Sequence, residues 1–241
     1  MKVCSQTLRA CPEEGQKMEE KKIKIIRDGP YLVTGNIPLK EEIITPVDDH
    51  YEYQDGRKLP QKEKYSLCRC GKSSNPPFCD GEHNHFDFDG EETASRERYA
   101  ERAEMLEGEE IDLMDDKRCA LLRFCHTEKG STWELIEESD EKEKRDLAVK
   151  SAGECLAGRL TALTKEGEVL EEDYSPEIVI LQDPEKNSSS AIIVKGNIPV
   201  ESADGEIYEK RNSLALCRCG QSDNKPFCDC THYHIRFKDK D

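Results

Sequence analysis

Two stretches of sequence decide the fold, residues 68–83 (CRCGKSSNPPFCDGEH) and residues 217–232 (CRCGQSDNKPFCDCTH). Both contain the spacing Cys-x-Cys-x8-Cys-x3-His, and the motif Gly-Asn-Ile-Pro recurs upstream of them at 35–38 and 196–199. A repeat of this length indicates two copies of one structural unit. We call the unit around 68–83 copy 1 and the unit around 217–232 copy 2.

Short β-strands are expected upstream of each cysteine motif. Residues 23–26 and 31–33 in copy 1, and 178–181 and 192–194 in copy 2, are rich in β-branched residues and are followed by Gly, Asn and Pro. An Asp-Gly pair then precedes the cysteines in both copies and favours a hairpin turn. Copy 1 has additional residues between Pro38 and Asp55, which predict a longer loop there.

The composition favours folding around metal. Charged residues make up 37% of the 241 residues, hydrophobic residues only 35%, and there are 12 cysteines. Metal binding commonly replaces a sparse apolar core, because its free energy becomes folding free energy.

The charge and hydropathy patterns exclude several classes of protein. The net charge of −16 argues against binding to nucleic acid or to a membrane surface. No apolar run is long enough to cross a membrane, and the first residues lack the apolar region of a signal peptide. We therefore expect a cytoplasmic protein with reduced thiols.

Each motif supplies four candidate metal ligands in two pairs. Residues two apart on an extended chain point to the same side, and residues four apart share a helix face. Cys68 and Cys70 can thus hold one metal, and Cys79 and His83 a second metal if a helix begins at Asp80. The full set of predicted ligands is Cys68, Cys70, Cys79, His83, Cys217, Cys219, Cys228 and His232.

Zinc and iron both suit this donor set. Three cysteines and one histidine form a standard tetrahedral zinc site. The Cys-x-Cys beginning favours a two-iron cluster, because paired cysteines at zinc sites are more often separated by two to four residues.

Both motifs resemble the CDGSH iron–sulfur domain of the mitoNEET-like proteins. Ser73, Pro77 and Asp80 match positions of the family pattern in copy 1. Ser222, Pro226 and Asp229 match them in copy 2. The resemblance implies one [2Fe–2S] cluster in each copy, and it implies intertwined pairing of the two copies, because single-copy members form intertwined homodimers.

Two residues depart from the family pattern. Glu82 replaces the small residue before the ligand histidine in copy 1. Cys230 replaces glycine in copy 2, which makes the backbone freedom of Gly81 dispensable there and places a spare thiol next to the ligands. Cys230 is thus a competing ligand.

The segment between the copies has a different character. Residues 91–116 are acidic, and residues 93–106 have helical composition with a stop at Gly108. A second helix is expected over 141–152, capped by Asp140.

Three cysteines in this middle segment resemble another ligand pattern. Cys119, Cys125 and Cys155 resemble the C-x5-C…C-P set of small ferredoxin-like domains, with a strand expected at Trp133 and with Leu156 in place of the proline. The resemblance implies a [3Fe–4S] or [4Fe–4S] cluster. The alternatives for its fourth ligand are His126, Cys4, Cys11 and water. Small buried thiols without metal are the competing interpretation.

We therefore expect an α+β protein with two small β-rich units that form an intrachain pseudo-dimer. The expected boundaries are 21–90 for copy 1, 91–116 for an acidic helical linker, 117–172 for a small inserted ferredoxin-like α/β domain, and 173–241 for copy 2. The pairing predicts a monomer with an internal pseudo-twofold axis.

Electron transfer is the first functional hypothesis, with a redox protein as partner. A histidine ligand in place of a thiolate raises the reduction potential. The alternatives are a carrier or a redox and pH sensor that releases [2Fe–2S] to apo acceptor proteins, and a structural zinc protein. No phosphate loop, nucleotide fingerprint or nucleophile elbow is present, so no enzyme is expected. His50, His85 and His234 are interpreted as surface or supporting groups.

Overall fold

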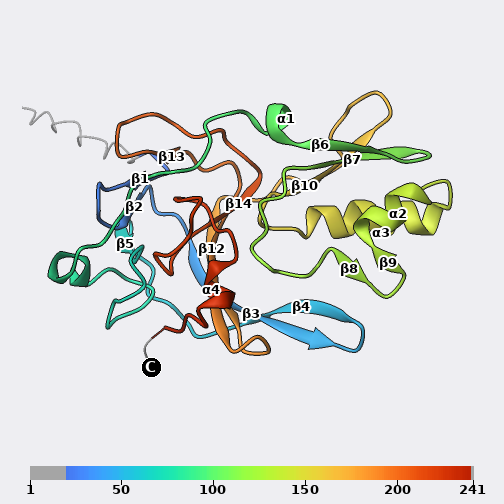
Figure 1. Cartoon of the computed structure of the whole chain (residues 1–241). Helices are drawn as coiled ribbons and strands as arrows, with labels where there is room; N and C mark the ends of the chain where they lie inside the picture. The colour runs from blue at the N-terminus through green and yellow to red at the C-terminus, as the bar shows by residue number, and fades with distance from the viewer. Residues whose placement is uncertain (1–19, 240–241) are drawn as a thin grey trace, which may run out of the picture.

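The two copies form two neighbouring β-sheets in the computed structural model, which describes residues 20–239 (Figure 1). The first sheet has the order β13-β1-β2-β5, and its strands are Val200–Glu201, Lys22–Ile25, Tyr31–Thr34 and Tyr65–Leu67. The second sheet has the order β14-β12-β11-β3-β4, and its strands are Ser213–Leu216, Ser188–Lys195, Glu177–Asp183, Leu39–Val47 and His50–Asp55.

The copies exchange one strand reciprocally. Copy 2 contributes β13 to the first sheet, where Val200 pairs in parallel with Ile23 of β1. Copy 1 contributes β3 to the second sheet, where Leu39 pairs in parallel with Ile178 of β11. Each sheet therefore contains three strands of one copy and a matching strand of the other, which is the pattern of an isologous contact, and the second sheet has β4 of copy 1 as an additional edge strand.

A single apolar core joins the two copies. It combines alternate residues of β1 and β2 with alternate residues of β11 and β12, all of them buried. Its best-buried members include Ile23, Ile25, Tyr31, Val33, Leu67, Ile178, Ile180, Ile192, Val194 and Leu216. Because strand side chains alternate between faces, one face of each sheet closes this core.

Copy 2 is covered on its other face as well. Val179, Leu181 and Ile193 point away from the shared core and pack against Leu122 and Phe124 of the middle segment. The strands β11 and β12 are consequently buried on both faces, and their sequences are almost continuously apolar or small.

The middle segment forms a third sheet with two helices. The strands β6 (Glu104–Glu107), β7 (Ile111–Asp115) and β10 (Leu160–Thr164) lie in the order β10-β7-β6. The helices α2 (Thr132–Glu137) and α3 (Lys142–Gly153) pack on this sheet through Leu135, Ile136 and Ala148 (Figure 1). A two-stranded hairpin, β8 (His126–Thr127) with β9 (Gly130–Ser131), precedes α2. The described chain is thus a mixed α+β structure that is rich in strands.

The helix expected over 93–106 is wrong for most of its length. Only α1 (Tyr99–Arg102) is helical, and β6 follows it directly. Leu106 pairs with Leu113 across a hairpin, and this pairing buries apolar side chains that a solvated helix leaves exposed. Gly108 lies in the hairpin turn, where a Cβ atom would come 2.1 Å from the carbonyl oxygen of Ile136. The sheet of the middle segment therefore begins before the expected boundary at 116.

The strand expected at Trp133 is also wrong, because α2 begins there. Ser131 accepts a hydrogen bond from the amide of Glu134, and the Glu134 carboxylate accepts one from the amide of Ser131. This capping box starts a helix. The helix expected over 141–152 is confirmed as α3, but its N-cap is Glu141, without a side-chain hydrogen bond, rather than Asp140.

The strands expected in both copies are confirmed as β1, β2, β11 and β12, with ends that differ from the expected ones by at most four residues. The hairpin turn at Asp204-Gly205 is confirmed, because the amide of Gly205 bonds to the carbonyl of Ser202. The equivalent turn at Asp55-Gly56 is wrong, since Asp55 ends β4. The additional residues of copy 1 form the β3–β4 hairpin rather than a loop.

Among residues 20–239, the structure contains no helix that is both long and apolar enough to span a membrane.

Candidate metal centre

The predicted ligands lie in four close pairs, two in each copy. In copy 1 the sulfur atoms of Cys68 and Cys70 are 3.7 Å apart, and the Cys79 sulfur lies 3.4 Å from Nδ1 of His83. In copy 2 the corresponding distances are 3.6 Å for Cys217 and Cys219, and 3.3 Å for Cys228 and His232.

These distances fit ligands that share one tetrahedral metal. Two sulfur ligands at about 2.3 Å from such a metal lie about 3.7 Å from each other. In the described part of the chain, no three His, Cys, Asp or Glu side chains converge on a single metal position. The donors are therefore arranged two by two, which suits one iron per pair.

A short β-ladder brings the two pairs of each copy together. The amide of Cys68 bonds to the carbonyl of Pro77, and the amide of Cys79 bonds to the carbonyl of Ser66. In copy 2, Cys217 and Cys228 make the same bonds to Pro226 and Ala215. The strand before the first cysteine thus holds the segment that carries the third cysteine through an isolated β-bridge, Leu67 with Phe78 in copy 1 and Leu216 with Phe227 in copy 2.

The turn between the two pairs is closed by a serine in each copy. Ser73 donates its hydroxyl to the carbonyl of Phe78 and accepts the amide of Asn75. Ser222 makes the equivalent bonds to Phe227 and Asn224. This explains why both copies keep a serine at this position.

An aspartate organises the backbone around the histidine. Asp80 accepts hydrogen bonds from the amides of Ser74 and Glu82, at 2.7 and 3.1 Å. Asp229 accepts equivalent bonds from Asp223 and Thr231, at 2.8 and 3.0 Å. The amide of Ser74 is the main reason that the pKa of Asp80 is lowered.

A left-handed residue precedes the histidine in both copies. Gly81 has φ of 92° and is followed by the 3-10 helix η1 (Glu82–His85). Cys230 has φ of 63° and is followed by α4 (Thr231–His234). The expectation that this backbone freedom is dispensable in copy 2 is therefore wrong, because Cys230 adopts the strained conformation itself.

The Cys230 thiol lies beside a histidine that is not a predicted ligand. Its sulfur is 3.9 Å from Nε2 of His234, whereas Cys228 faces Nδ1 of His232. Burial raises the pKa of the Cys228 thiol well above its usual value, and a hydrogen bond from the amide of Cys230 opposes this increase.

Hydrogen bonds from backbone amides converge on the first cysteine of each copy. The thiol of Cys70 and the amides of Ser73 and Gly71 lower the pKa of Cys68 to about 6. In copy 2, the thiol of Cys219 and the amides of Ser222 and Gly220 lower the pKa of Cys217 to about 7. Such N–H groups stabilise metal-bound sulfur and tune the potential of iron–sulfur sites.

The two histidines have different surroundings. His83 and Cys79 are half-buried, whereas His232 and Cys228 are only 4% and 5% exposed. Nε2 of His232 lies 3.5 Å from the hydroxyl of Ser190. Burial, followed by the charge of Arg218, lowers the pKa of His232 to about 4. The lowered pKa favours the neutral imidazole, which is the form of histidine able to bind a metal.

Two residues of the repeat were missed as functional groups in the sequence. Arg69 and Arg218 are 2% and 3% exposed and bind backbone carbonyls behind the ligand cysteines. The sequence contained a signal for these arginines, because the tetrapeptide Cys-Arg-Cys-Gly is identical in both copies.

The segments that carry the predicted ligands, residues 68–83 and 217–232, are called the two ligand loops here. These loops contact each other at their glycines. A Cβ atom on Gly71 would lie 2.5 Å from the carbonyl oxygen of Cys219, and one on Gly220 would lie 2.7 Å from that of Cys70. Tyr31 of copy 1 adds a hydrogen bond of 2.8 Å to the carbonyl of Cys217. The sites are thus built against each other, although the sequence shows no sign of this contact.

The middle cysteines are half-buried and do not converge on one metal position within the described residues. Cys125 and Cys155 pack beside the core of the middle segment, and burial raises the pKa of Cys155 to about 12. The Cys119 sulfur accepts the amide of Leu121 at 3.3 Å. Three protein residues were candidates for the fourth ligand. His126 is the first residue of β8, whereas Cys4 and Cys11 lie outside the described residues.

The remaining histidines are at the surface. His85 and His234 are exposed at the ends of η1 and α4, and His50 lies near Glu52 on β4.

A comparison with family models matches two segments of the chain, 28–84 and 190–233, to the iron-binding zinc finger of CDGSH type. Both matched segments contain a complete ligand set. Comparisons with curated proteins and with solved structures gave no match. The chain is thus identified as carrying two CDGSH-type iron-binding segments in tandem.

Proposed function

We propose that the chain is a one-electron carrier that holds a [2Fe–2S] cluster in each copy. Cys68, Cys70, Cys79 and His83 hold the first cluster, and Cys217, Cys219, Cys228 and His232 hold the second. A bound cluster of this kind supplies one-electron redox chemistry. The paired arrangement of the donors, with a spacing of 3.3–3.7 Å inside each pair, is the observation that carries the proposal.

The chain's own residues support this function in three ways. Backbone amides stabilise the thiolates of Cys68 and Cys217. Burial keeps His232 neutral. The contact between the two ligand loops, through Gly71 and Gly220, keeps the sites close enough for exchange of electrons within one molecule.

The reciprocal strands support an intrachain pseudo-dimer. Since β3 and β13 complete the sheets of the opposite copies, one chain supplies both halves of the pair. We propose that the protein is a monomer and that its partner is a redox protein.

Metal analysis after anaerobic expression tests the proposal. We expect two irons and two sulfides per copy, a coloured protein, and a paramagnetic signal after reduction with dithionite. A colourless zinc-saturated protein, stable to reductant, would exclude it. Three or four additional irons would fill the site predicted on Cys119, Cys125 and Cys155, which stays a prediction from sequence.

Cluster delivery is a second candidate, and the half-buried pair of Cys79 and His83 favours it. An acceptor can reach these ligands directly. His83→Cys should slow transfer to an apo-ferredoxin strongly, whereas His232→Cys should leave the rate of the first transfer unchanged. Equal transfer by His83→Cys and the unmodified protein would rule out this role.

A further inference from the structure

Tyr31 extends from copy 1 to the ligand loop of copy 2. The residue is fully buried, and its hydroxyl lies 2.8 Å from the carbonyl oxygen of Cys217 and 3.1 Å from that of Pro226. A hydroxyl has a single proton, so the two carbonyl groups share it. Burial raises the pKa of Tyr31 well above its usual value, and the hydroxyl therefore stays protonated and able to donate.

The two carbonyl groups lie where the ligand-bearing segments of copy 2 meet. Cys217 is the first predicted ligand, and its amide donates to the carbonyl of Pro226. Pro226 stands two residues before Cys228, the third predicted ligand. One proton from copy 1 thus ties together both segments that carry predicted ligands in copy 2. This contact adds to the hydrogen bonds that copy 2 makes within itself.

Copy 2 has no tyrosine at the matching position. Tyr31 pairs with Leu67 in the first sheet, and Ile192 pairs with Leu216 at the same place in the second sheet. Leu67 and Leu216 directly precede the first predicted ligands of their copies. An isoleucine side chain has no hydrogen-bond donor. Residue 192 of copy 2 therefore offers no proton to the ligand loop of copy 1.

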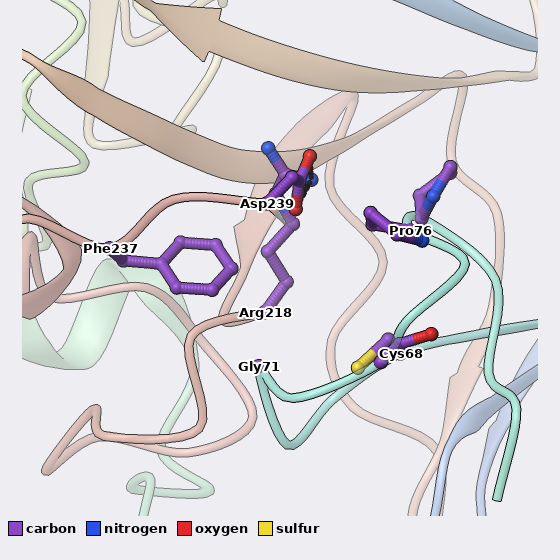
Figure 2. Close-up of a pocket in the computed structure, with 8 residues that line it drawn as sticks. Cys68, Gly71, Pro76, Arg218, Phe237 and Asp239 are labelled. Carbon is purple, nitrogen blue, oxygen red and sulfur yellow. Dashed lines mark hydrogen bonds and ion pairs between the residues drawn. The ribbon is translucent and has the colours of Figure 1, made fainter. Parts of the chain in front are cut away.

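A small cavity borders the ligand loop of copy 1 at the corresponding place (Figure 2). Its walls include Cys68 and Pro77, the counterparts of the two residues that bind the Tyr31 hydroxyl, and Arg218 of copy 2. Arg218 is the counterpart of Arg69, whose guanidinium lies 5.8 Å from the centroid of the Tyr31 ring. The cavity has a volume of about 10 Å³. The groups that surround the phenol beside copy 2 thus surround a small cavity beside copy 1.

The hydroxyl has two expected effects on a metal site in copy 2. A buried hydrogen bond that ties both ligand-bearing segments opposes their separation, and iron can leave only when the ligands separate. The positive end of the O–H dipole also points toward the ligand segments. Because reduction adds negative charge at the site, this dipole favours the reduced form and raises the reduction potential.

We propose that Tyr31 is a positioning residue through which copy 1 retains the iron of copy 2 and raises the reduction potential of that site. This inference rests on the proposed function and adds a dependence between the copies. The strand β2 of copy 1 stabilises the iron site of copy 2 through one hydroxyl, and the strand β12 of copy 2 does not return this contact at Ile192.

Tyr31→Phe tests the inference in the full iron-loaded chain, because it removes the hydroxyl and keeps the buried ring. A His83→Cys background separates the signals of the two sites, since an all-cysteine site differs in potential from a site with a histidine ligand. At copy 2 we expect loss of iron to a chelator to become about fivefold faster, as for the loss of one buried hydrogen bond. The ratio of oxidised to reduced copy 2 at fixed potential should rise about threefold, which is a decrease in potential of about 28 mV.

Tyr65→Phe is the matched control. The Tyr65 hydroxyl is also buried and donates to a backbone carbonyl, that of Ile37 at 2.9 Å, which lies outside both ligand loops. We expect this variant to leave iron loss and potential at copy 2 unchanged.

The inference is overturned if Tyr31→Phe changes neither property at copy 2, if it changes copy 1 as much as copy 2, or if Tyr65→Phe has the same effect. A chain that binds no iron contradicts the proposed function. An iron-loaded Tyr31→Phe chain with an unaltered copy 2 contradicts only this inference.

Discussion

The ligand loop of copy 2 is enclosed, whereas the ligand loop of copy 1 faces solvent. The amides of Thr93 and Ala94 both bond to the carbonyl of Lys225, and the guanidinium of Arg118 lies 4.5 Å from the ring centroid of Phe227. In copy 1 the equivalent carbonyl, that of Pro76, accepts a hydrogen bond from the guanidinium of Arg57 at 2.7 Å, and Nζ of Lys62 lies 5.7 Å from the ring centroid of Phe78. These contacts come from copy 1 itself rather than from the linker or the middle segment, and they leave Ser74, Asn75 and Asp80 exposed.

The comparison shows that one ligand motif can be placed in two different environments within a single chain. The hydrogen bonds that define the motif are the same in both copies, down to the serine and the aspartate. The copies differ in the residues that pack against the outside of this motif. We therefore expect the two sites to differ in properties that depend on solvent access or charge. We expect them to be alike in properties that depend on the contact between Gly71 and Gly220.

The largest expected effect is a loss of stability at the contact between the two ligand loops, in which Gly71 and Gly220 occupy equivalent positions. Gly71→Ala and Gly220→Ala should each destabilise the protein by about 3 kcal/mol. Left-handed backbone costs about 1–2 kcal/mol for a side chain, and overpacking against a carbonyl adds about 1–3 kcal/mol. Denaturant unfolding measures both variants.

Gly167→Ala provides the control, because Gly167 has φ of 87° but a methyl group placed on its Cα would have no neighbouring atom within 4 Å. It should cost about 1 kcal/mol. If Gly71→Ala costs no more than this control, the two loops do not press on each other.

The next effect is a dependence of stability on pH in the metal-free chain, which we expect from His232 and not from His83. The pKa of His232 is lowered to about 4 by burial, so the unfolded chain binds a proton that the folded chain rejects. Stability should be constant above about pH 6.5. It should then fall by about 3 kcal/mol as the pH drops to about 4.

His232→Gln should remove most of this slope in urea unfolding measured at several pH values. His83→Gln should retain it, because His232 is still present. A slope that survives in His232→Gln would assign it to another group.

A smaller effect concerns access to the bound iron. A chelator should remove iron in two phases, with copy 1 about tenfold faster, equivalent to about 1.4 kcal/mol in barrier height. His83→Cys should slow only the fast phase, and His232→Cys only the slow phase. Loss of absorbance with time measures both. Single-phase loss would mean that the enclosure of copy 2 does not limit access.

The smallest effect concerns the left-handed residue before each histidine. Cys230→Gly relieves strain of about 1–2 kcal/mol but makes the unfolded chain freer by about 0.4–1 kcal/mol, so we expect a net gain of about 0.5 kcal/mol. Gly81→Ala should lose about 1 kcal/mol. Thermal unfolding of the two variants gives the comparison, and a destabilised Cys230→Gly protein would show that the thiol itself contributes.

The repeat and the strands that precede its cysteines could be predicted from the sequence, because these signals are local; the ligand assignment stays a prediction. Cys68 and Cys70 had to share a side if extended, and the structure brings their sulfur atoms together. The predictions of secondary structure were wrong where contacts beyond the local composition determine the structure. Leu106 and Trp133 were assigned from composition, whereas a hairpin partner and a capping box determine their structure. The role of Arg69 depends on carbonyls that are distant in sequence, so spacing alone did not reveal it.

The reciprocal exchange of β3 and β13 has a consequence for how this molecule can change. In a homodimer every substitution occurs twice, once on each side of the axis, and must be tolerated at both places. In a chain that supplies both halves, a substitution occurs once. Copy 2 can therefore have Asp239 where copy 1 has Gly90, and Cys230 where copy 1 has Gly81, without any requirement of self-complementarity. Joining the halves covalently thus permits the two copies to specialise.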